Sequence, residues 1–218
     1  MIKLYKKIAL IGPPASGKTT QAERIEQKFN LPRLTTGQIL RQNKNQKTEY
    51  GKPRNYIEKG KLVPDPLIVQ IVKQHLSQPE FSEGFVLDGY PRTIKQAEAL
   101  HDFKPLDIVL MLQLEDAKIQ ERASERMYCP ECGETYHLRL KPPKRYGICD
   151  RCGSKLKARE DNSRTALKGQ IKEYRNKTKK LVDFYEAYSK LEKIDANGTI
   201  ENTWNQVKTR IKRDGDNV

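Results

Sequence analysis

Short apolar runs alternate with longer stretches of helical pattern along most of the chain. Residues 7–11, 85–87 and 108–112 are apolar runs with the length of a buried strand, and a weaker run covers 191–195. Helical patterns lie between them, the first over 21–29 directly after a glycine-containing loop. Because strands that alternate with helices form parallel sheets covered on both faces, the pattern predicts an α/β fold.

Two stretches interrupt this alternation. Residues 35–64 have the pattern of short helices ending at Gly60 and Pro64, while 127–160 is rich in Cys, Pro, Gly and Lys and has little core-forming pattern. A long, charged helix over about 163–190 is predicted to return the chain to the sheet, and the tail at 214–218 is expected to fray. We therefore expect one main domain with two insertions.

The composition fits a soluble globular protein. Hydrophobic residues make up 36% and charged residues 32% of the 218 residues. No apolar run approaches the roughly 20 residues that a membrane span requires. The N-terminal apolar run has no small-residue cleavage site after it, so we expect a cytoplasmic protein.

The formal net charge of +14 leaves three interpretations open. Basic patches bind nucleic acids through their phosphates. A solvated Lys-rich surface and a pocket for small polyanions account for the charge equally well. The basic residues are spread along the chain rather than gathered in one block, which does not favour nucleic-acid binding.

Residues 12–19 match the phosphate-binding pattern G-x-x-x-x-G-K-[ST] between a predicted strand and a predicted helix. Such a loop directs backbone N–H groups and the positive end of a helix dipole at phosphate oxygens. Lys18 is expected to reach the β and γ phosphates, and the Thr19 hydroxyl to meet Mg²⁺. The alternative is a turn that only joins strand to helix. The residues expected to hold the triphosphate are Gly12, Ala15, Ser16, Gly17, Lys18, Thr19 and Thr20.

A second candidate segment follows the strand predicted at 85–87. Asp88 stands at the end of this strand, where a carboxylate can hold the water shell of a metal ion, and Arg92 offers a planar fork for a phosphate. The alternative for Asp88 is a cap on the next helix.

All four cysteines lie in two C-x-x-C pairs, Cys129 with Cys132 and Cys149 with Cys152. Two tight turns that each offer two thiolates predict a zinc-ribbon site. Four sulfur ligands leave no open position for water, so the zinc is expected to be structural. Two disulfides or unliganded thiols are the alternatives, and a reducing cytoplasm disfavours the disulfides.

Four ordered segments together resemble the adenylate kinase family in its long-lid form. They are the loop at 12–19, T-T-G-Q-I-L-R at 35–41, G-K-L-V-P-D at 60–65 and D-G-Y-P-R-T at 88–93. The similarity runs in order from Ile8 to about Gly198. It implies a P-loop nucleoside-triphosphatase fold whose five-stranded parallel sheet is flanked by helices. The implied division is a core of 1–34, 65–126 and 163–218, an NMP-binding insertion at 35–64 and a zinc-ribbon-like lid at 127–162.

The resemblance also implies the roles of single residues. Lys18, Asp88, Arg92, Arg126 and Arg159 are the implied catalytic group. Arg122, Arg126, Thr135, Tyr136 and Ile200 complete the implied ATP site. The implied AMP site consists of Thr36, Arg41, Lys61, Leu62, Val63, Gly89, Tyr90, Pro91, Arg92, Gln96, Arg159 and Gln170. Arg41 and Arg92 suit the AMP phosphate, and the Gln96 amide suits an adenine edge. His137 is interpreted as structural or adjacent to the nucleotide.

The implied reaction is reversible, Mg²⁺-dependent phosphoryl transfer from ATP to AMP. The protein is expected to be a monomer that does not bind membranes. Three positions depart from the family pattern: Gln38 replaces a usual acidic residue, Asp161-Asn162 a usual Asp-Asp, and Gln170 a usual arginine. Two alternatives therefore stay open. One is a kinase with other nucleotide preferences, such as a GTP:AMP or UMP/CMP enzyme, and the other is a catalytically weakened zinc-ribbon nucleic-acid binder.

Overall fold

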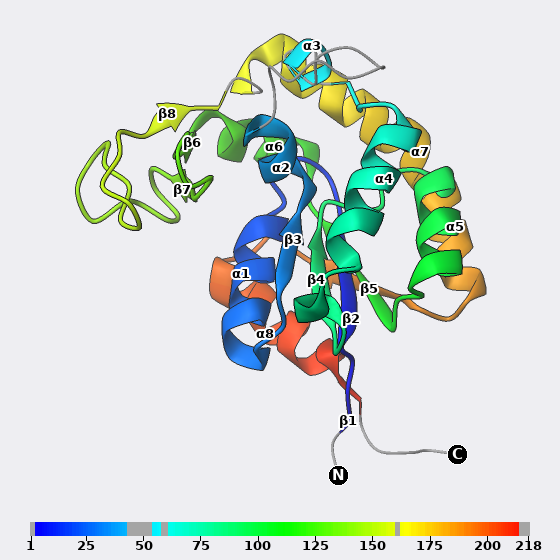
Figure 1. Ribbon diagram of the computed structural model, residues 1–218. Helices are drawn as coiled ribbons and strands as arrows, with labels where there is room; N and C mark the ends of the chain where they lie inside the picture. Colours follow the sequence, from blue (N-terminus) through cyan, green and yellow to red (C-terminus); the bar gives the residue numbers. More distant parts are fainter. Residues whose placement is uncertain (1–2, 43–53, 58–60, 160–161, 214–218) are drawn as a thin grey trace.

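The centre of the fold is a sheet of five parallel strands (Figure 1). In the computed structural model, which describes residues 3–42, 54–57, 61–159 and 162–213, their order is β3-β4-β2-β5-β9. The strands are β2 (Lys7–Ile11), β3 (Arg33–Thr35), β4 (Phe85–Asp88), β5 (Ile108–Gln113) and β9 (Leu191–Asp195). The expected parallel α/β fold is therefore confirmed.

Four of these strands coincide with the apolar runs of the sequence, and β3 does not. β3 has three residues, of which only Leu34 is buried, and it lies at the edge of the sheet beside β4. An edge strand of this length buries too few side chains to leave a readable apolar pattern. The pairing of Thr35 with Asp88 still matters, because it aligns the ends of the two strands that lead to the candidate site.

Helices cover both faces of the sheet, as the continuous apolar runs predict. In β2, Ile8 and Leu10 pack in a cluster with residues of α1 and α8, whereas Ala9 and Ile11 belong to a cluster with residues of α4, α5 and α7. Successive side chains of a strand point to opposite faces, so this strand is buried on both. The helices are α1 (Lys18–Phe29), α4 (Asp65–Leu76), α5 (Ile94–Phe103), α6 (Asp116–Ser124), α7 (Arg164–Ala187) and α8 (Ile200–Ile211).

Smaller elements depart from the sheet where the sequence pattern is interrupted. A three-stranded antiparallel sheet, ordered β7-β6-β8, lies within the predicted lid and carries its own small cluster of buried side chains. The remaining elements are β1 (Lys3–Leu4), α2 (Thr36–Gln42), α3 (Arg54–Ile57), the 3-10 helix η1 (Pro79–Phe81), β6 (Arg126–Tyr128), β7 (Thr135–His137), β8 (Lys157–Ala158) and β10 (Lys212–Arg213). β1 and β10 form an additional antiparallel pair that was not predicted.

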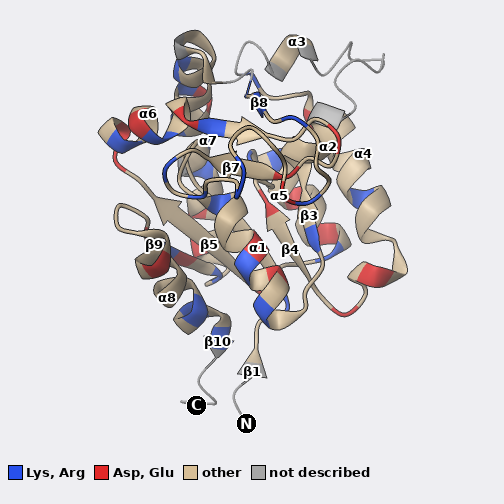
Figure 2. Ribbon diagram, turned by 90° about the vertical axis from the view of Figure 1, so that its left-hand side faces the viewer, with Lys and Arg blue, Asp and Glu red and all other residues tan. Residues whose placement is uncertain are grey.

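The long helix predicted after the lid is α7, and the Ser163 hydroxyl caps it by accepting a hydrogen bond from the Ala166 N–H. Within the described ranges, none of the helices combines the length and hydropathy that crossing a bilayer would take. Lys and Arg residues occur along α1, α6 and α8, interspersed with Asp and Glu (Figure 2). Gly60, Asp161 and the tail at 214–218 lie outside the described residues.

Candidate active site

The glycine loop joins β2 to α1, and its conformation depends on glycine at two positions. A Cβ on Gly12 would lie 2.5 Å from the carbonyl oxygen of Leu112, so only glycine fits beside β5. Gly17 takes φ 89° as the residue before α1, a conformation that side chains disfavour. The helix consequently begins at Lys18, earlier than the predicted residue 21, and its positive end faces the loop.

A cavity of about 300 Å³ opens beside this loop. Every residue expected to bind ATP or AMP lines it, with the exception of Arg41, which lies in α2 and whose side chain is outside the described part of the structure. Asp88 lines it as well. Segments far apart in the sequence thus meet at one hollow, although the role of each residue there stays a prediction.

Positive charge converges on the end of the loop. The Lys18 ammonium donates to the carbonyl oxygens of Gly12 and Pro13 at 3.0 and 2.6 Å. Burial lowers the pKa of Lys18 to about 7, with Asp88 opposing this change and the charges of Arg92, Arg126 and Arg159 adding to it. The three arginines therefore lie close enough to act on this one ammonium. Such an arrangement of cations suits a polyanionic ligand.

Asp88 lies beside the phosphate loop and does not cap the next helix. The Thr19 hydroxyl donates to its Oδ2 at 2.6 Å, so a hydroxyl and a carboxylate stand side by side next to the loop. These hard oxygen groups suit Mg²⁺ and the waters around it. The capping alternative is wrong for Asp88, because the Thr93 hydroxyl caps α5 by accepting from the Gln96 N–H at 3.2 Å.

The expected AMP side of the cavity is held by hydrogen bonds around Gln96. Its Oε1 accepts from the Arg92 N–H at 2.8 Å, and its Nε2 donates to Asp65 Oδ1 at 2.6 Å. The Thr93 hydroxyl donates to the other oxygen of Asp65 at 3.0 Å. An amide keeps a second N–H and a second lone pair, so adenine recognition by this orientated group stays a prediction. Asp65 was not predicted, and its position at the start of α4 gave no chemical signal.

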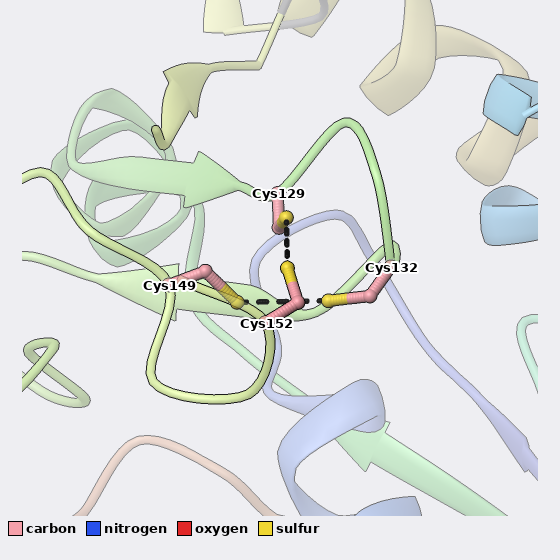
Figure 3. A group of neighbouring side chains, drawn as sticks. All are labelled: Cys129, Cys132, Cys149 and Cys152. Carbon is pink, nitrogen blue, oxygen red and sulfur yellow. Dashed lines mark hydrogen bonds between the residues drawn. The ribbon is translucent and has the colours of Figure 1, made fainter. Parts of the chain in front are cut away.

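The four cysteines form one cluster in the lid (Figure 3). Their sulfur atoms lie within 4.8 Å of one another, with Cys129 and Cys152 at 3.4 Å and Cys132 and Cys149 at 3.6 Å. A tetrahedron of sulfurs about 2.3 Å from a zinc ion would have edges of about 3.8 Å, so the group fits this metal. The distances are too long for disulfides, which require about 2.05 Å, and that alternative is wrong.

Both C-x-x-C turns have the same construction. The N–H of Gly133 donates to the carbonyl oxygen of Cys129 at 3.0 Å, and the N–H of Gly153 donates to that of Cys149 at 2.9 Å. Each of these glycines has a positive φ, at 73° and 75°, which lets the chain close the turn behind the second cysteine. Two equivalent turns therefore present two sulfurs each to a common centre.

The two ends of the lid are tied together by Asn162. Its Nδ2 donates to the carbonyl oxygen of Arg126 at 2.8 Å, and its Oδ1 accepts from Arg126 Nε at 3.0 Å. Arg126 and Arg159 thus stand at opposite ends of the lid beside the same cavity. Because Asn162 is neutral, it orientates Arg126 without reducing its positive charge.

Arg122, His137 and Gln170 also line the cavity. Arg122 donates to the carbonyl oxygens of Ala196 and Gly198 at 2.9 and 3.0 Å. The Nδ1 of His137 accepts from the N–H groups of Arg139 and Leu140 at 3.3 and 3.2 Å, which favours the structural interpretation of this histidine. Gln170, where an arginine was expected, lines the same cavity.

Comparison with known proteins finds relatives over most of the length of this chain. A model described as adenylate kinase matches residues 10–190. A protein named adenylate kinase from Clostridium novyi is 38% identical over 95% of this chain and 99% of its own. Adenylate kinases from Methanosarcina barkeri and Caldicellulosiruptor bescii are 39% and 42% identical over 94% and 83% of this chain, and over 98% and 87% of their own. The chain therefore belongs to the adenylate kinase family.

Proposed function

We propose that the protein transfers the γ-phosphoryl group of MgATP to AMP and so forms two molecules of ADP in a reversible reaction. The observation that supports this best is the convergence of Lys18, Arg92, Arg126 and Arg159 beside one cavity that holds both the phosphate loop and the expected AMP residues. Relatives named adenylate kinase over nearly the whole chain support the same reaction. No observation favours another acceptor or a nucleic acid.

The reaction needs no general base, because the phosphate of AMP is already an anionic nucleophile at neutral pH. One oxygen of the AMP phosphate attacks the γ phosphorus of ATP while the bond to the β-γ bridging oxygen breaks. Arg92 would orientate the attacking phosphate, and Lys18, Arg126 and Arg159 would stabilise the negative charge of the transferring group. Mg²⁺ bound with ATP would add to this stabilisation, and Thr19 and Asp88 are the residues placed to hold it.

The lid would exclude water from the transfer. Thr135 and Tyr136 of the lid and Arg126 directly before it line the cavity, so the triphosphate would be enclosed between the lid and the loop. Exclusion of water from a closed site prevents hydrolysis of the triphosphate. We accordingly propose the division into a core of 1–34, 65–126 and 163–218, an AMP-binding insertion at 35–64 and a lid at 127–162.

We further propose that the four cysteines hold one structural Zn²⁺. The fit of their sulfur positions to a tetrahedron supports zinc, and four thiolates would leave no site for catalysis on the metal. Thiols kept free for a metal suit a reducing compartment, so a cytoplasmic location fits this site. A monomer suffices for the reaction, since one chain supplies every proposed substrate contact.

Phosphorus NMR of the purified protein with MgATP and AMP tests the activity directly. We expect ADP signals to grow only when AMP is present, with little hydrolysis in the AMP-free control. A Lys18→Met variant should lose the transfer, whereas a Lys28→Met variant, changed at an exposed position of the same helix, should keep it. Failure of the normal chain to form ADP from AMP would contradict the proposal, and GMP, UMP and CMP would then be tested as acceptors.

A further inference from the structure

The first turn of the cysteine cluster contacts the expected AMP-binding insertion. Gln38 Nε2, from α2, donates to the carbonyl oxygen of Cys132 in the lid at 3.0 Å. The fit is close, because a Cβ on the neighbouring Gly133 would lie 2.4 Å from the same nitrogen. The hydrogen bond therefore joins two parts of the chain that both contribute residues to the wall of the cavity.

A second contact joins the lid to the core. Lys141 Nζ lies 2.6 Å from Glu23 Oε2 and 2.8 Å from Glu134 Oε1, so this lysine of the lid bridges a carboxylate of α1 and a carboxylate of the lid itself. The Glu23 side chain is 12% exposed, and Arg33 of β3 approaches it at 3.6 Å. Ion pairs sheltered from water in this way contribute more than fully exposed pairs do.

Neither Glu23 nor Gln38 belongs to the cavity wall, which includes their neighbours Gln21 and Gly37. Both have polar contacts with the lid instead. We propose that Glu23 and Gln38 are positioning residues that hold the lid closed over the bound nucleotides, Glu23 through Lys141 and Gln38 through the Cys132 carbonyl group. This inference rests on the proposed kinase activity, because it assigns these residues a part in substrate binding.

The expected effect follows from the population of closed lid. When only the closed form binds tightly, the apparent dissociation constant of the nucleotide rises as the closed fraction falls. Loss of the negative charge from the ion pair of Glu23 with Lys141, or of the amide contact of Gln38, is expected to raise the KM for MgATP roughly tenfold. The kcat should stay the same or increase, since these residues do not touch the transferring group and lid opening follows the chemistry.

The variants Glu23→Gln and Gln38→Ala test the proposal, with Arg24→Gln as the matched control. Arg24 is also on α1 and forms an ion pair with Glu201 of α8 at 2.6 Å, so its loss removes a charged contact that does not involve the lid. Steady-state kinetics should give a raised KM for MgATP in the two lid variants and the normal value in the control. Melting temperatures identify a variant that fails to fold. If one of the two lid variants fails in this way, the KM of the other one tests the proposal.

Hydrogen exchange of the nucleotide-free protein gives a measurement that does not depend on turnover. We expect faster exchange in residues 129–134 of the two lid variants than in the normal chain or the control. An unchanged KM together with unchanged hydrogen exchange would overturn the proposal that Glu23 and Gln38 hold the lid closed. If the normal chain shows no phosphoryl transfer, the proposed function fails, while the exchange measurement still decides whether these contacts hold the lid.

Discussion

The lowered pKa of Lys18 predicts that nucleotide binding takes up a proton. In the free protein burial lowers this pKa to about 7, so at pH 8 only about one tenth of the Lys18 amines carry a charge. The phosphates of bound ATP stabilise the ammonium and should return its pKa toward the ordinary value of about 10.4. At pH 8 binding is therefore expected to take up about 0.9 protons, and at pH 6 about 0.1.

The same linkage sets the direction of the pH dependence. The free protein loses the Lys18 proton as the pH rises through about 7, whereas the ATP complex keeps it to a much higher pH. Between these two pKa values the affinity for ATP should decrease by about tenfold per pH unit. Below pH 7 Lys18 is charged in both states and should contribute no further dependence.

Isothermal titration calorimetry at pH 8 measures this uptake. The enthalpy of ATP binding is compared in buffers with different enthalpies of ionisation, and the slope of that comparison is the number of protons bound. A Lys18→Arg variant is the control, because a guanidinium stays charged in both states and should show no uptake at this position. An enthalpy for the normal chain that does not depend on the buffer would refute the reasoning, since it would mean that Lys18 is already charged in the free protein.

Three further changes have defined outcomes. Gln170→Arg places a charged donor beside the cavity and should raise kcat by about tenfold or more in a steady-state assay. An equal or lower kcat would mean that neighbouring cations already stabilise the charge of the transferring phosphate. Leu110→Ala removes a fully buried side chain from the central sheet and should lower the free energy of unfolding by about 2 to 5 kcal/mol. Denaturation followed through the fluorescence of Trp204 measures this loss, and a value well under 1 kcal/mol would contradict the observed packing. Cys152→Ser should reduce the zinc content below one ion per chain and lower the melting temperature of the lid, as measured by metal release and calorimetry. Full retention of zinc by this variant would show that the four cysteines are not the zinc site.

The sequence predicts the parts of the fold whose burial is complete. The runs that became β2, β4 and β5 are apolar except at an end of each strand, because both faces of these strands are covered by helices. β3 was not predicted, since a three-residue edge strand is defined by its pairing with β4 and not by its own composition. The pairing of β1 with β10 likewise joins the two ends of the described chain and has no local signal.

The same distinction separates the site residues that were predicted from those that were not. The phosphate loop and the cysteine pairs depend on spacing within a few residues, so their chemistry can be read directly from the sequence. The contact of Glu23 with Lys141 joins residues 118 positions apart, and neither residue belongs to a motif. A lysine or glutamate on a helix or loop is usually a solvated surface residue, so only the tertiary structure identifies this pair.

We expect a metal ion bound by the four cysteines to act on the proposed reaction by stiffening the lid. Arg126 and Arg159 stand at the two ends of the proposed lid, and Asn162 fixes the first of them. In the proposed reaction the position of the lid would therefore determine how much positive charge reaches the transferring phosphate. Among its described residues, the lid has a small apolar cluster of its own, in which Cys129 and Cys149 are two of the buried members. A metal that joins these cysteines would therefore turn a weakly packed insertion into a body that moves as one unit. The turn that carries Cys132 also contacts Gln38, so a metal at this site would be expected to connect the proposed closure contact with the two arginines.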